Sequence, residues 1–93
     1  MYYIISLERT KISDTHFTFW RKKGDGFCIS KENAGIFPKI TEGYHDTPNS
    51  LPILASVADS LLEPIKGLST HGIATTNLVA LGLKISGNRF VRI

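Results

Sequence analysis

The apolar positions at the start of the chain predict a β-strand. Residues 2–7, "YYIISL", are rich in aromatic and β-branched side chains, and apolar residues occupy both alternating faces. A strand that is apolar on both faces is typical of the interior of a sheet. We therefore expect a central strand here.

A β-hairpin is predicted directly downstream. The segment 16–21 alternates two phenylalanines on one face with Thr18 and Trp20 on the other, which is the period of a half-buried strand. Residues 22–26, "KKGDG", supply the glycines and the aspartate that a tight loop requires. Residues 27–29 then return beside the first strand of the hairpin.

Two main helices are predicted in the second half of the chain. The longer helix covers residues 51–62, begins at an N-cap on Ser50 and ends before Pro64. A shorter helix over residues 77–81 stops at Gly82. The apolar stripe of the longer helix has the spacing of one helical face and comprises Leu54, Val57, Ala58, Leu61 and Leu62.

Shorter elements complete the expected fold. Residues 31–34 follow a serine and precede a glycine, which predicts a single helical turn. The tail, residues 83–93, places apolar residues around a Gly-Asn pair and suits either a tight hairpin or one bent strand. We expect an α+β fold in which a small antiparallel sheet, built from the N-terminal strand, the hairpin and the C-terminal strand or hairpin, is packed by the two main helices.

Composition supports one folded domain. The 93 residues leave room for a single domain, 1–93, and the 42% apolar and 20% charged content is ordinary for a globular protein. The net charge of +3 permits acidic partners without requiring them. The single cysteine cannot form an internal disulfide, no signal-like segment precedes the first strand, and no apolar run is long enough to span a membrane. We expect a cytoplasmic protein, either a monomer or a homodimer.

The chemistry-bearing residues predict neither an enzyme nor a metal or cofactor site. Cys28 has no Cys-x-x-Cys partner, and the three histidines lack the spacing of a helical zinc site. A nucleophilic arrangement of Cys28 with His45, oriented by Asp46, is the catalytic alternative. It predicts a thiolate with a low pKa.

Two features stand out as candidate binding residues. Arg21, Lys22 and Lys23 form a cationic step beside Trp20 where a hairpin needs turn residues but not three charges. Downstream, Tyr44 and His45 either anchor a loop to the core or stand at an interface. The cations have two alternative interpretations. They are either solvated residues of a loop or part of a nucleic-acid-binding surface that a second basic group, Lys84, Arg89 and Arg92, would extend.

Part of the chain resembles small uncharacterised accessory proteins of bacteriophages and prophages. The motifs that carry the resemblance lie between residues 17 and 62, with a weaker echo at residues 77–83. They are Phe19-Trp20, Gly26-Phe27, Ala34-Gly35-Ile36-Phe37, Tyr44-His45 and Leu51-Pro52-Ile53. The chain departs from the pattern at Lys22 and Lys23, where Pro-Asn-type turn residues are usual, and at Phe37, where tyrosine is more usual.

The resemblance implies a class of protein rather than a target. Phage accessory proteins include many small binders that alter host enzymes or block defence systems, as anti-CRISPR inhibitors do. We therefore expect a non-enzymatic protein that binds and modulates or inhibits a host or defence protein, through the hairpin from Trp20 to Phe27 and the loop from Tyr44 to Asp46. The alternative is a small basic nucleic-acid-binding protein, for which binding would weaken steeply with salt.

Overall fold

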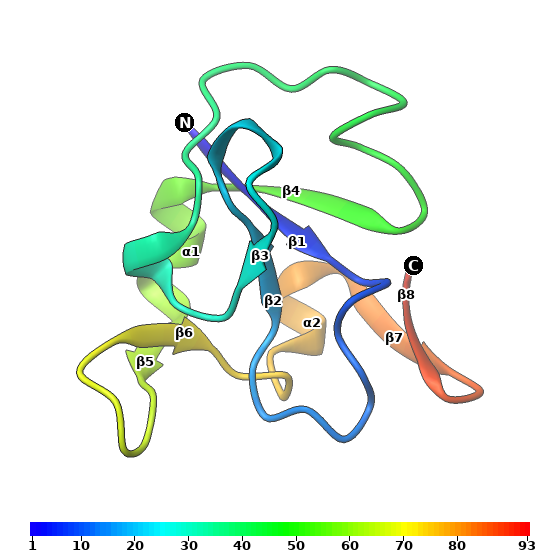
Figure 1. Cartoon of the computed structure of the whole chain (residues 1–93). Coiled ribbons are helices and arrows are strands. Elements are labelled where there is room, and N and C mark those ends of the chain that lie inside the picture. Colours follow the sequence, from blue (N-terminus) through cyan, green and yellow to red (C-terminus); the bar gives the residue numbers. More distant parts are fainter.

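A four-stranded antiparallel sheet forms the centre of the protein. The structure, a computed structural model, describes residues 1–93, except for the surroundings of Gly24. The strands lie in the spatial order β3 (Phe27–Cys28), β2 (Thr18–Trp20), β1 (Tyr2–Ser6) and β4 (Ser50–Leu54) (Figure 1). The interior position predicted for the first strand is thus confirmed.

Two separate hairpins and several short helices complete the chain. The hairpins pair β5 (Leu62–Pro64) with β6 (His71–Ile73) and β7 (Leu83–Ser86) with β8 (Arg89–Arg92). The helical elements are η1 (Lys22–Gly24), η2 (Lys31–Asn33), α1 (Ala55–Leu61) and α2 (Leu78–Leu81). Within the described residues, no helix has the length and apolar content needed to cross a bilayer.

The expected α+β fold with two main helices on one sheet is wrong. The described residues form three small antiparallel sheets, and among their helices only α1, with seven residues, is longer than four residues. The predicted helix over residues 51–62 begins four residues late, because the segment from Ser50 to Leu54 pairs with β1 as a strand. The predicted N-cap, Ser50, therefore lies inside β4 rather than at a helix start.

The physical reason is that the apolar residues at the start of that segment follow a period of two. Leu51 and Ile53 are both 7% exposed and face the core together, whereas Leu54 is 48% exposed. Of the predicted stripe, Ala58 is buried and Leu61 and Leu62 are partly buried against the core, whereas Leu54 and Val57 are exposed, so the stripe is only partly used. Short apolar runs satisfy helix and strand spacings equally, and here the pairing with β1 decides between them.

The hydrophobic core lies on one face of the sheet. Ile5 of β1 pairs directly with Phe19 of β2, and both are fully buried. Phe17 precedes β2 on the same face and contacts Phe90 of β8, with ring centroids 5.3 Å apart. Phe90 therefore fixes the terminal hairpin to the core.

Three of the local turn predictions agree with the structure. The hairpin between residues 16 and 29 is formed by β2 and β3, and the tail forms a hairpin rather than a bent strand. Helix α2 ends at Gly82, whose φ of +66° is the left-handed conformation that glycine adopts without strain. Residues 31–33 form a single turn, as expected.

Gly35 has a different role from the helix cap that the sequence suggests. The residue at the cap is Ala34, whereas Gly35 lies against the backbone that leaves β2. Its N–H donates to the Trp20 carbonyl oxygen at 2.9 Å. A Cβ at this position would lie 2.6 Å from the backbone nitrogen of Lys22. Glycine thus allows the segment after η2 to pack on the hairpin.

Candidate functional site

Trp20 and Phe27 stand opposite each other on the face of the sheet that points away from the core. They are a cross-strand pair, Trp20 on β2 and Phe27 on β3. The neighbouring pair is hydrogen-bonded, because the Arg21 N–H donates to the Gly26 carbonyl oxygen at 2.9 Å. Trp20 and Phe27 therefore form a non-hydrogen-bonded pair, in which side chains approach most closely. Because side chains alternate along β2, Trp20 faces opposite to buried Phe19.

A distant loop adds two more rings to Trp20. Tyr44 and His45 lie with ring centroids 5.4 and 5.7 Å from the Trp20 ring, and Phe37 lies 5.2 Å from His45. We call Trp20, Phe37, Tyr44 and His45 the aromatic cluster. The structure therefore brings together the residues that the sequence singled out separately in the hairpin and in the loop.

Hydrogen bonds to Thr41 hold the loop in this position. The N–H groups of Tyr44 and His45 both donate to the Thr41 carbonyl oxygen, at 3.1 and 2.9 Å. In return, the Thr41 N–H donates to Nδ1 of His45 at 2.8 Å. Since a backbone N–H only donates, Nδ1 is the unprotonated nitrogen of the ring and Nε2 carries the proton. His45 thus serves to anchor the loop, and Tyr44 is left at the surface.

The cluster borders a small groove at the surface. Its lining residues are Trp20, Arg21, Gly26, Phe27 and Tyr44, and its volume is about 140 Å³. We call this the hairpin groove. Two of its aromatic side chains are strongly exposed, Phe27 at 40% and Tyr44 at 58%. The groove is therefore apolar and open to solvent.

Cationic residues surround the groove. The Arg9 guanidinium carbon lies 4.5 Å above the centre of the Phe27 ring, and Arg21 Nε donates to the Phe27 carbonyl oxygen at 3.2 Å. Lys22 and Lys23 are exposed on the adjoining turn. None of these four residues belongs to the ion pairs found among the described residues.

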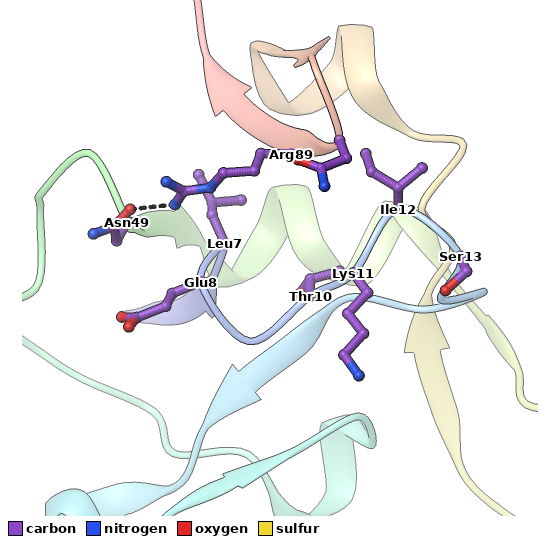
Figure 2. A pocket seen from close by; sticks show the side chains of 9 residues that line it. Leu7, Glu8, Thr10, Lys11, Ile12, Ser13, Asn49 and Arg89 are labelled. Carbon is purple, nitrogen blue, oxygen red and sulfur yellow. Dashed lines mark hydrogen bonds between the residues drawn. The ribbon is translucent and has the colours of Figure 1, made fainter.

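The second basic group has different surroundings. Arg92 forms an ion pair with Asp46 and also donates to the Thr47 carbonyl oxygen at 3.2 Å. Arg89 Nη2 donates to Asn49 Oδ1 at 2.7 Å (Figure 2). Lys84 is exposed on β7. Both arginines are therefore engaged by the segment that follows His45.

A larger groove of mixed polarity lies beside Arg89. It has a volume of about 740 Å³ and is open to solvent. Figure 2 shows the side chains of Glu8 and Lys11 directed away from the Arg89 guanidinium, which instead reaches Asn49. The charged groups of this groove do not converge on one point. It is lined by Leu7, Glu8, Thr10, Lys11, Ile12, Ser13, Asn49, Asn88 and Arg89.

The three residues of the catalytic alternative each contact other partners. The Cys28 thiol donates to the Ser30 carbonyl oxygen at 3.4 Å, and burial raises its pKa above the ordinary value although Arg21 acts to lower it. His45 Nδ1 accepts from Thr41, and Asp46 pairs with Arg92. Apart from Gly24, whose surroundings are undescribed, the chain gathers no three His, Cys, Asp or Glu side chains that could hold a metal ion.

Sequence reasoning missed two residues of the site. Phe37 completes the aromatic cluster, and Arg9 covers one face of Phe27. The sequence gives a signal for Phe37, because this aromatic residue ends a segment that must return to the sheet. It gives no signal for Arg9, which contacts the hairpin from a polar loop. No family model matches the chain, and neither the curated proteins nor the solved structures include a significant match.

Proposed function

We propose that this is a non-catalytic binding protein that modulates or inhibits a bacterial host or defence protein by covering part of its surface. The binding face is the hairpin groove and its rim. The phage-type resemblance of the sequence supplies the class of target, with anti-CRISPR-like inhibition as one form of the activity. The geometry of the surface supports the choice of this binding face.

The observation that carries the proposal is an exposed aromatic patch outside the core. Phe27 and Tyr44 keep large apolar areas in water although the chain has a separate, well-buried core on the other face of the sheet. Aromatic and arginine side chains dominate the binding energy of protein interfaces. Trp20, Arg21, Phe27 and Tyr44 place these residue types around one groove, which favours a protein partner.

Capture from a bacterial lysate tests the proposal. Immobilised protein is compared with Phe27→Ser and Tyr44→Ser, which remove exposed rings without opening the core. Val79→Ser is the matched control, because Val79 is 93% exposed on α2 and lies outside the groove. We expect one stoichiometric protein to be retained by the wild type and by Val79→Ser and lost from both groove variants.

Two results would oppose the proposal. Equal retention by the wild type and by both groove variants would place the binding face elsewhere on the molecule. Retention of no stoichiometric protein from lysates of several bacterial hosts would count against a host or defence target. Circular dichroism spectra of all four proteins provide the check that each variant is folded.

A further inference from the structure

We infer that the hairpin groove receives a single apolar side chain projecting from an acidic surface of the partner protein. This inference rests on the proposed function and specifies the chemistry of the partner. Three features carry it: the size and apolar walls of the groove, the cations at and beside it that form no ion pair among the described residues, and the backbone conformation of Lys23.

The groove has the dimensions of one side chain. Its volume of about 140 Å³ is well below the size of a pocket for a drug-sized molecule. The rings of Trp20, Phe27 and Tyr44 provide its apolar surface, so that a leucine-, methionine- or phenylalanine-type side chain would bury its apolar area there. Anchors of this kind, in a central pocket with a charged rim, are typical of binding hot spots.

The positive charge at the rim of the groove favours a partner with a negatively charged surface. Arg9 and Arg21 lie at the groove, and Lys22 and Lys23 belong to the turn that joins its lining residues Arg21 and Gly26. None of these four cations has a salt-bridged carboxylate among the described residues. Asp25 and Glu32 line a neighbouring pocket together with Arg21 and Lys22, and Glu32 is paired with His71. A partner surface rich in carboxylates would therefore meet a positive potential, which speeds association and excludes basic surfaces.

The conformation of Lys23 indicates that its charge is retained for binding rather than for folding. Its φ of +55° lies in the left-handed region, which costs about 1–2 kcal/mol for a residue with a side chain. Glycine would remove this cost, as it does at Gly26 in the same turn, where φ is +95°. A strained residue at the rim of a groove points to a function for its side chain.

The same surface is less suited to a single-stranded nucleic acid. Such ligands stack their bases on open aromatic faces and contact a continuous cationic track. Arg9 covers one face of the Phe27 ring. Trp20 is in T-shaped contact with Tyr44 and His45, which leaves less of its ring open for stacking. The second basic group does not extend a track, because Asp46 and Asn49 engage its arginines.

Trp20 provides a direct reporter because it is the single tryptophan of the chain. The probe is a short capped peptide in which runs of glutamate and aspartate flank a central leucine. The matched peptides carry a central glycine, or lysine runs around the leucine. We expect the acidic leucine peptide to shift the Trp20 emission to shorter wavelength, the glycine peptide to bind about tenfold more weakly, and the lysine peptide to give no shift.

Variants assign the effect to the rim. Arg21→Gln and Lys23→Gln should each weaken the acidic peptide about two- to fivefold. Lys66→Gln, in the exposed turn between β5 and β6, should leave its affinity unchanged. Equal binding of the lysine peptide, or no effect of the central leucine, would overturn the inference. Tighter binding of oligothymidylate than of the acidic peptide would overturn it in favour of a nucleic acid.

The outcome is separable from that of the proposed function. If the lysate capture succeeds with loss in the groove variants, but the captured protein presents a basic surface, only the inferred chemistry is wrong. If no groove-dependent capture occurs, the proposed function fails regardless of the peptide results.

Discussion

Replacing Lys23 with glycine is expected to stabilise the fold while weakening partner binding. Lys23 has a φ of +55°, and relief of this left-handed strain is worth about 1–2 kcal/mol. The added freedom of glycine in the unfolded chain offsets about 0.4–1 kcal/mol of that gain. The free energy of unfolding should therefore rise by about 0.8 kcal/mol, the middle of a range from about 0 to 1.6 kcal/mol, which corresponds to a Tm higher by about 3–6 °C in a domain of this size.

Lys22→Gly is the matched control because it removes the same charge from the neighbouring residue. Among the described residues, Lys23 is the one non-glycine with a positive φ, so Lys22 has no such strain to relieve. Glycine at position 22 should lower the free energy of unfolding by about 0.4–1 kcal/mol. Thermal unfolding followed by circular dichroism compares the two variants with the wild type.

Binding of the acidic leucine peptide should weaken in both variants by about two- to fivefold, since each loses one cation from the rim. A lower Tm for Lys23→Gly would refute the assignment of strain to this residue. A higher Tm with unchanged peptide affinity would show that the side chain at this position has no binding role.

The remaining predictions concern the packing that presents the groove. Gly35→Ala places a Cβ 2.6 Å from the backbone of the hairpin turn and should lower the free energy of unfolding by about 1–3 kcal/mol; urea unfolding measures this, and an unchanged midpoint would contradict the close packing. Phe90→Ala should lower the free energy of unfolding by about 3–5 kcal/mol. If urea unfolding shows a decrease below about 1 kcal/mol, this ring does not fix the terminal hairpin to the core. The side-chain hydrogen bond from His71 holds the pKa of Glu32 at about 2, below its ordinary 4.5. The stabilisation from this carboxylate is therefore present above about pH 4.5 and is lost as the pH falls toward 2. The stability advantage of the wild type over Glu32→Gln should disappear across this window in urea unfolding, and an advantage independent of pH would contradict the pairing.

The strands that rest on local alternation were predictable from the sequence. Tyr2–Ser6 is a continuous aromatic and β-branched run that predicted an interior strand, and the hairpin around residues 22–26 combines a period of two with turn residues, so pattern and structure agree at both places. The start of the segment 51–62 was not predictable, because a short apolar run such as Leu51 to Leu54 can belong to a strand or to a helix. Its strand pairing depends on β1, nearly fifty residues away in the register, and such contacts have no local signature.

The candidate site shows the same division between local and long-range information. Trp20, Arg21 and Tyr44 stand out by residue type, and the structure places all three around one groove. Their meeting depends on the Thr41–His45 hydrogen bond and on the close approach of Gly35 to the hairpin. The hydrogen bond is local, between residues four apart, but Gly35 approaches Lys22 and Tyr44 meets Trp20 across more than ten residues, and residue spacing along the chain carries no trace of these two contacts.

The most direct test of the proposed binding face is a calorimetric titration of the captured partner into the wild type, Tyr44→Ser and Val79→Ser. We predict that Tyr44→Ser binds at least about tenfold more weakly than the wild type, because an exposed aromatic anchor is lost. Val79→Ser should match the wild type. Equal affinity of Tyr44→Ser and the wild type would contradict the hairpin groove as the site of partner binding.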